Sequence, residues 1–123
     1  MRLEYLHSKN YVHRDIKPDN FCIGSTDTHT IYLIDFGLAT KYKNSKTGEH
    51  YLNECHNSLT GTARFASLCA HKGETQTRKD DLEGLGYVLL YFLKGSLPWQ
   101  GLAAVNKKDK YEKIYHKKQT MAI

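Results

Sequence analysis

The chain has 123 residues, of which 40% are hydrophobic and 25% charged, the composition of an ordinary globular domain rather than of a disordered or fibrous protein. Its formal net charge is +5, and most of the excess lies after residue 103, where six lysines face two acidic residues. A solvated helix face is the first interpretation of such a run, with nucleic acid or acidic peptides as functional alternatives.

The cysteines and the apolar runs indicate the cellular compartment in which we expect the protein to function. Three cysteines without a C-x-x-C spacing argue against a disulfide framework and a structural zinc site, and are typical of a reducing compartment. The most apolar run, residues 84–93, has about half the length of a bilayer crossing, and residues 1–10 lack the apolar core of a signal peptide. We therefore expect a soluble protein of the cytoplasm, the nucleus or both, with no membrane partner.

The first part of the chain predicts the end of a helix followed by a β-hairpin. Two leucines repeat at helical spacing in residues 1–10, with no capping residue before them. Residues 11–12 then form a short extended piece. Two β-rich runs at 21–23 and 31–34 flank a polar loop, which predicts an antiparallel hairpin.

The second part predicts a long irregular segment and two helices. Residues 37–67 have no clear period and are rich in polar residues, and so long a stretch in a compact domain is usually functional or disordered. A helix is predicted from residue 80 or 81 to 93; because it is apolar nearly all round, we expect it to be buried. Lys94-Gly95 ends it, and a basic amphipathic helix follows over 104–118. Together these elements predict a mainly helical α+β fold with a small β-hairpin.

Two motifs flank the predicted hairpin. The first is His13-Arg14-Asp15-Ile16-Lys17-Pro18-Asp19-Asn20, and the second, Asp35-Phe36-Gly37, begins fifteen residues after Asn20. A D-F-G triplet alone is a weak signal, but coincidence is a poor explanation for both motifs in this order and at this distance. Pairing of the hairpin is expected to bring Asn20 and Asp35 together. The pattern resembles the catalytic loop and the D-F-G magnesium site of protein kinases.

The side chains of the two motifs suit phosphoryl transfer, which needs positioning and neutralisation of charge. Asp15 is expected to accept the proton of an attacking hydroxyl, and Lys17 to face the transferred phosphate of ATP. Asn20 offers a carbonyl oxygen and Asp35 a carboxylate, both of which suit Mg²⁺. ATP and Mg²⁺ are thus the predicted cofactors, bound by Lys17, Asn20 and Asp35. For Arg14, pairing with a phosphate on the 37–67 segment and an ordinary surface position are both open.

Further segments narrow the resemblance. Most kinases have a G-T-x-x-Y-x-A-P-E segment where this chain has Thr60-Gly61-Thr62-Ala63-Arg64-Phe65-Ala66-Ser67, and no A-P-E triplet occurs. Residues 78–89 and 96–101 and the run Lys110-Tyr111-Glu112-Lys113-Ile114 fit the same group. On these motifs, over residues 3–118, the chain resembles the casein kinase 1 family of serine/threonine protein kinases.

This resemblance implies an activity, a substrate class and further site residues. The activity is transfer of the γ-phosphate of ATP to serine or threonine in acidic or already phosphorylated protein substrates. Thr62 stands where such kinases place a threonine that braces the catalytic aspartate and lysine. Asp81 stands where they place an aspartate that holds the catalytic-loop backbone. Arg64 and Lys110 fall at positions that the family uses to bind an anion of the substrate.

Two positions depart from the family pattern. Cys69 replaces an asparagine that helps to tie the 37–67 segment to the core, so this segment is expected to be looser. Asn57 stands where the family often has a basic residue, which weakens the expected anion site. Both changes are typical of a divergent member.

The kinase motifs upstream of the catalytic loop do not occur in this sequence. It has no Gly-rich phosphate loop and no strand lysine, and Gly84-x-Gly86 is no substitute, because it lacks the third glycine and lies in the apolar helix. Residues 1–123 are therefore interpreted as a partial kinase domain, from the catalytic loop to the helix after Pro98, without the small lobe and the final helices. Weak or no activity is expected of this piece alone.

Two functions of other classes remain as alternatives to a kinase. The first is a non-catalytic module, derived from a kinase, that binds phosphopeptides. Its face would be the anion site at Arg64 and Lys110. The second is nucleic-acid binding through the lysine helix, which ranks last because few aromatic residues interleave with the lysines.

Overall fold

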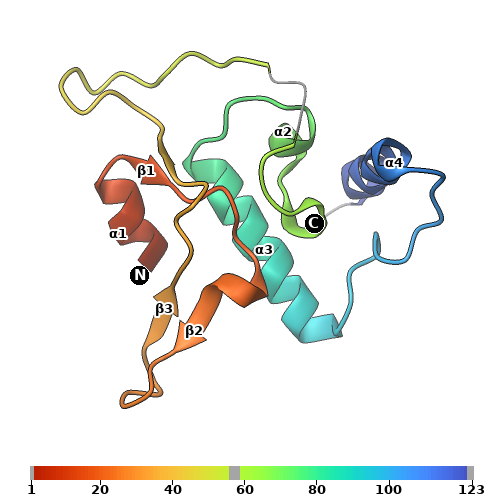
Figure 1. Ribbon diagram of the computed structural model, residues 1–123, viewed down its shortest axis with the longest axis horizontal. Coiled ribbons are helices and arrows are strands. Elements are labelled where there is room, and N and C mark those ends of the chain that lie inside the picture. The colour runs from red at the N-terminus through yellow and green to blue at the C-terminus, as the bar shows by residue number, and fades with distance from the viewer. Residues whose placement is uncertain (1, 56–58, 122–123) are drawn as a thin grey trace.

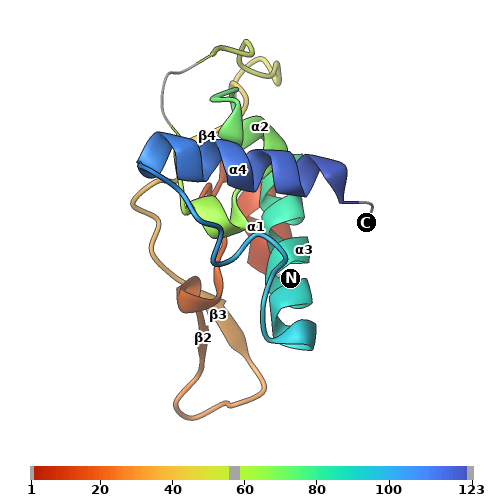
Figure 2. The same cartoon turned by 90° about the vertical axis from the view of Figure 1, so that its right-hand side faces the viewer.

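The computed structural model describes residues 2–55 and 59–121 and has the predicted α+β character, with helices predominating over small antiparallel sheets. In Figure 1 the helix α3 lies at the centre, with α1 and the hairpin on one side and α2 and α4 on the other; Figure 2 shows that α4 crosses the direction of α3. The elements in chain order are α1 (Arg2–Ser8), β1 (Tyr11–Val12), the 3₁₀ turn η1 (Pro18–Asn20), β2 (Phe21–Ile23), β3 (Ile31–Leu33), β4 (Thr40–Lys41), the 3₁₀ turn η2 (Ala63–Phe65), α2 (Leu68–His71), α3 (Arg78–Lys94) and α4 (Lys107–Thr120).

The predicted hairpin is confirmed. Strands β2 and β3 are antiparallel, with Cys22 opposite Tyr32 at the centre of the pairing. One further backbone bond, from Ile34 N to Asn20 O (2.9 Å), continues the ladder past the last paired strand residues. The chain therefore enters the hairpin at Asn20 and leaves it at Ile34, directly before Asp35.

A second small sheet lies where the sequence predicted none. Strand β4, at the start of the irregular 37–67 segment, pairs antiparallel with β1, with Val12 opposite Thr40. Two-residue strands are too short to show a periodicity of two, so their pairing is set by tertiary contacts rather than by a sequence pattern. The pairing ties the beginning of the long segment to the residues just before His13.

Helix α3 begins earlier than predicted because of its N-terminal capping residues. Thr77 is the N-cap, and its backbone N–H donates to Asp80 Oδ2 (2.8 Å) in a capping box. The helix ends at Gly95, as predicted: this residue has a left-handed φ of 79°, and its N–H donates to Tyr91 O (2.8 Å).

The expectation that this apolar helix is buried on all sides is wrong for the part of the chain that the structure describes. Its buried residues are Asp80, Asp81, Gly84, Tyr87 and Val88. Four large apolar side chains are more than half exposed: Leu82, Leu89, Phe92 and Leu93. The reason is that the loop at 13–20, the turn η2 and α2 all pack on the same side of α3, and a helix presents only part of its circumference to such neighbours.

Helix α4 is amphipathic, as predicted, but starts later. Asn106 caps it by accepting a hydrogen bond from Asp109 N (2.9 Å), and Ile114 is buried on its inner side. Five of the six lysines are exposed, in agreement with a solvated face. The sixth, Lys118, is buried with 3% of its surface exposed, so that interpretation was wrong for this residue.

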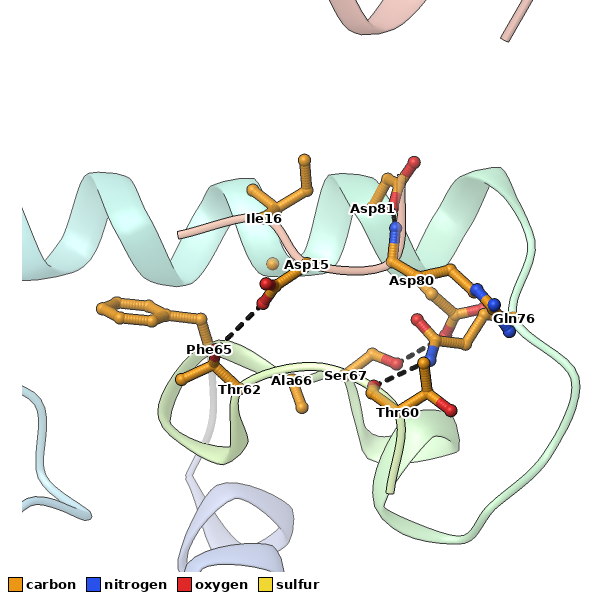
Figure 3. Close-up of a pocket in the computed structure, with 12 residues that line it drawn as sticks. Asp15, Ile16, Thr60, Thr62, Phe65, Ala66, Ser67, Gln76, Asp80 and Asp81 are labelled. Carbon is orange, nitrogen blue, oxygen red and sulfur yellow. Dashed lines mark hydrogen bonds between the residues drawn. The ribbon is translucent and has the colours of Figure 1, made fainter. Parts of the chain in front are cut away.

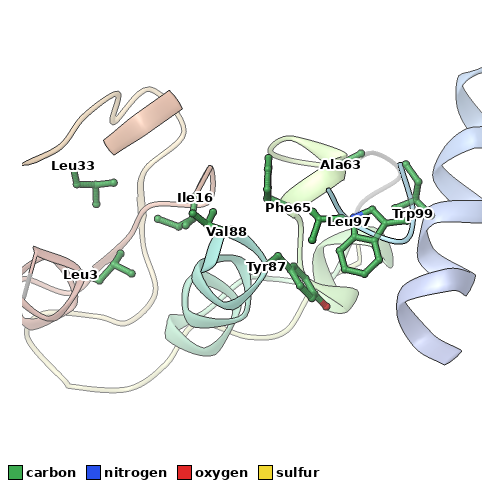
Figure 4. Packing of buried hydrophobic residues seen from close by; sticks show 10 residues of the cluster. Leu3, Ile16, Leu33, Ala63, Phe65, Tyr87, Val88, Leu97 and Trp99 are labelled. Atoms are coloured by element: carbon green, nitrogen blue, oxygen red, sulfur yellow. The ribbon is translucent and has the colours of Figure 1, made fainter. Parts of the chain in front are cut away.

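A single hydrophobic core joins these elements along α3. Figure 4 shows it running from Leu3 and Leu33, past Ile16 and Val88, to the ring of Trp99 on the side of α4. Gly84 allows a close approach of both segments to α3, because a Cβ there would lie 3.2 Å from Phe65 O and 3.3 Å from Ile16 Cβ. The core thus presses both the 13–20 loop and η2 against one helix. Within residues 2–55 and 59–121, none of the helices combines the length and apolar character that a bilayer crossing requires.

Candidate active site

The backbone of the 13–20 loop is held by Asp81, a residue of the first turn of α3 with 2% of its surface exposed. Its two carboxylate oxygens accept from consecutive N–H groups, His13 N (2.8 Å) and Arg14 N (3.0 Å). His7 Nε2, from α1, donates to the same carboxylate (2.9 Å). The contact expected between Asp81 and the loop backbone is confirmed, whereas no sequence pattern indicated the role of His7.

Arg14 has a left-handed backbone with a φ of 71°, which costs a residue other than glycine roughly 1–3 kcal/mol. Asp81 stabilises this conformation through the N–H of Arg14. Gly61 packs against it: a Cβ at Gly61 would lie 2.5 Å from Arg14 O, and its φ of 106° also requires glycine. The Arg14 side chain donates from Nε to Leu38 O (2.7 Å), so this N–H is already used within the protein. Burial, opposed by Asp81, lowers the pKa of Arg14.

His13 connects the loop to the end of the hairpin. It is fully buried, and its Nδ1 accepts from Asp15 N (3.1 Å). Because Nδ1 is an acceptor, Nε2 carries the hydrogen and donates to Ile34 O (2.9 Å). His13 is part of the sequence motif, but the motif alone did not predict a role for it. Its buried position shows that it fixes the distance between Asp15 and the residue before Asp35.

Asp15 lies at the centre of the predicted catalytic set. Its Oδ1 accepts from Thr62 Oγ1 (2.9 Å), a residue 47 positions later in the chain, as Figure 3 shows. Its Oδ2 lies 3.7 Å from Lys17 Nζ, and both side chains remain partly open to solvent. The structure therefore brings Asp15, Lys17 and Thr62 together. Hydrogen bonding of Thr62 to one oxygen leaves the other free to accept a proton.

Asn20 is fixed on the same loop with a defined orientation of its amide. It is 4% exposed, and its Nδ2 donates to Asp15 O (2.8 Å). Because the NH₂ group makes this bond, the Oδ1 atom is the end that remains available as an acceptor or a metal ligand. Its backbone oxygen is used by Ile34 N in the hairpin. Side chain and backbone of Asn20 thus connect Asp15 to the second motif.

Asp35 is held near this group through the backbone rather than through its side chain. It is exposed, has a left-handed φ of 59°, and its Oδ1 accepts from Gly37 N (3.2 Å). No hydrogen bond within the described ranges joins its carboxylate to Asn20 or Asp15. The backbone bond of the hairpin therefore joins the two motifs, and the carboxylate of Asp35 is not hydrogen-bonded to the other predicted site residues in the described ranges. A strained, exposed aspartate is typical of a functional position.

Residues 60–67, the end of the 37–67 segment, line a small pocket next to Asp15 together with residues at the start of α3 (Figure 3). The pocket has a volume of about 10 Å³, which is room for about one water molecule. Two hydrogen bonds join the segment to α3 and the residues just before it: Gln76 Nε2 donates to Thr60 O (3.1 Å), and Ser67 Oγ donates to Asp80 Oδ1 (2.7 Å).

The two positions that depart from the family pattern have different outcomes. Cys69 Sγ accepts from Lys79 Nζ (3.0 Å), and burial raises the pKa of its thiol. With Ser67 bonded to Asp80 two residues earlier, the end of the segment is attached to α3 on this side, and the looser attachment expected at Cys69 stays a prediction. Asn57 lies outside the described residues.

Arg64 and Lys110, the predicted anion-binding residues, line the same hollow of about 240 Å³, which Thr62 also lines. Both side chains are exposed. The position of Arg64 is fixed through its backbone, because Trp99 Nε1 donates to Arg64 O (2.7 Å). Arg64 and Lys110, 46 residues apart in sequence, thus line the same open hollow. Thr62, which donates to Asp15, lines it too.

The donors of this site fit a phosphorylated nucleotide with a hard cation. Asn20 Oδ1 and the carboxylate of Asp35 are oxygen ligands of the kind that Mg²⁺ prefers, on the two sides of one hairpin. Lys17 adds an ammonium group on the same loop. Comparison with known families gives one finding that covers this arrangement: a family model described as protein kinase domain matches residues 2–123.

Proposed function

This chain belongs to the protein kinase domain family, and from that premise we propose that it transfers the γ-phosphate of ATP to serine or threonine residues of proteins. One observation carries the proposal beyond family membership. Asp15 is hydrogen-bonded to Thr62, lies next to Lys17 and shares a loop with the oriented amide of Asn20. A base, a cation and an oxygen ligand around one point are the parts that phosphoryl transfer needs.

Asp15 acts as the base in this proposal. Thr62 occupies Oδ1, so Oδ2 accepts the proton as the substrate hydroxyl oxygen attacks the γ-phosphorus and the bond to the leaving ADP breaks. Lys17, 3.7 Å from the same Oδ2, stabilises the charge of the transferred phosphoryl group. Held by Asp81 and Asn20, the loop keeps both side chains in place before the substrates bind.

We propose that Mg²⁺ binds together with the nucleotide and that Asn20 and Asp35 would be its protein ligands. When bound, such an ion neutralises phosphate charge. Asn20 contributes Oδ1, because its Nδ2 is held by Asp15 O. Asp35 contributes Oδ2, because its Oδ1 accepts from Gly37 N.

We further propose that the chain is of the casein kinase 1 type and prefers acidic or phosphorylated peptides. The hollow with Arg64 and Lys110 supports this preference, because guanidinium and ammonium groups on its wall attract carboxylates and phosphates. Its boundary at Thr62 supports it too, because a peptide in the hollow then has a residue close to Asp15.

The test is phosphoryl transfer by the full-length protein, with labelled ATP and an acidic or phosphorylated peptide. We expect Asp15→Asn to lower kcat by roughly 10²–10⁴-fold, the usual contribution of a positioned base. Asp19→Asn is the matched control, since Asp19 is an exposed neighbour on the same loop, and it should retain wild-type activity. An inactive wild-type protein, or an Asp15→Asn variant as active as the control, would refute the proposal.

A non-catalytic phosphopeptide-binding module is the second candidate, and the hollow with Arg64 and Lys110 is the observation that favours it. The two candidates separate in one binding measurement with a labelled phosphopeptide. A pure binding module requires that Arg64→Ala abolish binding and that no transfer be detectable, with Asp15→Ala silent in every assay. Loss of transfer in Asp15→Ala, with binding kept, assigns the chain to the kinases.

A further inference from the structure

Lys118 is the buried exception in a row of exposed lysines, and its ammonium group is surrounded by acceptors. It lies in the last turn of α4 with 3% of its surface exposed. Nζ donates to Ala63 O (2.8 Å) and Ala66 O (2.6 Å), and lies 2.9 Å from His71 Nε2. The three acceptors match the three N–H groups of an ammonium, so none is left unpaired.

The surroundings of Lys118 show that this burial is unfavourable for the charge in itself. Burial lowers the pKa of Lys118 to about 7, opposed by the charge of Glu83 on α3. The rings of Tyr87 and Trp99 lie 5.1 and 5.2 Å from Nζ, which partly compensates through cation–π attraction. His71 faces Nζ from α2, and burial together with the Lys118 charge lowers the pKa of His71 to about 4, so the ring is a neutral acceptor. An apolar side chain would fill this space at a lower cost of desolvation, so the hydrogen bonds are what distinguishes lysine here.

The carbonyl groups that Lys118 binds bracket the turn η2. Between these two carbonyl groups lies Arg64, which lines the hollow shared with Lys110. The backbone carbonyl of Arg64 accepts from Trp99 Nε1 (2.7 Å). Three carbonyls within residues 63–66 are therefore held by two side chains from later in the chain. Directly before this turn stands Thr62, which donates to Asp15.

We propose that Lys118, assisted by Trp99, is a positioning residue for substrate binding: it fixes the 63–66 turn so that Arg64 faces the peptide in the hollow. This inference rests on the proposed function. It does not involve the proposed ATP site, because Lys17 and Asn20 lie on the 13–20 loop and Asp35 follows strand β3. The expected signature is therefore a selective loss of peptide affinity, stronger for a phosphorylated peptide than for its unphosphorylated form.

The experiment compares Lys118→Met with Lys117→Met in the full-length protein. Methionine keeps an unbranched side chain that is one atom shorter and removes the donors, and Lys117 is the exposed neighbour. We expect Lys118→Met to raise the KM for a phosphorylated peptide by about tenfold or more, the loss of a charged hydrogen bond, and to leave the KM for ATP within about twofold. Lys117→Met should change neither value. Unchanged peptide KM in a folded Lys118→Met protein, or an equal fall in every kinetic parameter, overturns the inference.

If Lys118→Met does not fold, Trp99→Phe decides. This variant keeps an aromatic ring, removes the N–H that Arg64 O accepts and replaces the indole by a smaller single ring, and it should raise the peptide KM in the same selective way; an unchanged KM overturns the inference. Anisotropy of a labelled phosphopeptide separates this outcome from failure of the proposed function. Binding that weakens in the Lys118 or Trp99 variant supports the positioning role even if the wild type transfers no phosphate, and binding that does not weaken refutes it.

Discussion

The two carboxylate oxygens of Asp15 have different partners, and this difference defines the proposed base. Oδ1 accepts from Thr62 Oγ1 (2.9 Å), whereas Oδ2 faces Lys17 Nζ at 3.7 Å, too far for a direct hydrogen bond. A carboxylate with one oxygen fixed and the other open to a new partner is oriented for proton transfer along one direction. In the proposed reaction Thr62 therefore acts through the orientation of Asp15.

A change at Thr62 tests this orientation. We expect Thr62→Val, which keeps the shape and removes the donor, to lower kcat about 10–100-fold, because a hydrogen bond to a charged group contributes roughly 1.5–3 kcal/mol. Thr62→Ser keeps the hydroxyl group and should stay within a few-fold of wild type. Steady-state kinetics with saturating ATP and peptide measures both, and equal activities of the valine and serine variants would contradict the assignment.

Residues in the two motifs were predictable because their meaning lies in spacing along the chain. Asp15, Lys17 and Asn20 occupy a fixed pattern, and the pattern already placed them on one loop. Lys118 was not predictable in this way. Its sequence neighbourhood is that of a solvated helix face, and only the folded chain brings the carbonyls of Ala63 and Ala66 to its ammonium group.

At the scale of elements, helix α3 contacts both the 13–20 loop and the turn η2 and holds them in place. Its first turn holds the 13–20 loop through Asp81, and Gly84, one turn later, lets Ile16 and Phe65 touch the helix. The start of this helix is set by the capping box of Thr77 and Asp80, which the apolar pattern did not reveal, whereas its C-terminal end was predicted from Gly95. Its exposed side was not, because an all-round apolar pattern does not reveal how many faces the neighbours cover.

The closeness of this packing predicts a contrast between two glycines of α3. Replacing glycine by alanine inside a helix normally stabilises it by about 0.8–1 kcal/mol. We expect this gain for Gly86→Ala, where a Cβ meets nothing within 4 Å. For Gly84→Ala the Cβ would lie 3.2 Å from Phe65 O, so the gain should be lost or reversed, leaving the variant about 1 kcal/mol or more below Gly86→Ala. Urea unfolding measures both free energies, and equal stabilities would show that α3 moves away without cost.

At the scale of the whole molecule, one core runs along α3 from α1 to α4, so a charge that is unfavourable at one place affects the stability of the entire unit. His71 is such a place. Burial and the Lys118 charge lower its pKa from 6.5 to about 4 in the folded chain. Between these values the unfolded chain binds a proton that the folded chain does not, so stability is fully present above about pH 6.5 and falls as the pH drops towards 4.

This linkage predicts a measurable difference between wild type and His71→Gln, which keeps an acceptor for Lys118 but cannot be protonated. The free energy of unfolding of the wild type should fall more steeply between pH 6.5 and 4, by at most about 1.4 kcal/mol per pH unit, and by less because the ring is only half-buried. Chemical denaturation at several pH values measures the two slopes. Parallel curves for the two proteins would exclude His71 as the source.

The two hydrogen bonds that Asp81 accepts from successive N–H groups have a consequence for the folding of the protein. The left-handed backbone conformation of Arg14 is unfavourable by itself. It is stabilised by the carboxylate of Asp81, in the first turn of α3, which accepts hydrogen bonds from the backbone of the loop. The stability of that first turn and the conformation of the 13–20 loop are therefore coupled. A substitution that frays the first turn of α3 should disable the proposed phosphoryl transfer while every proposed reacting group is still present.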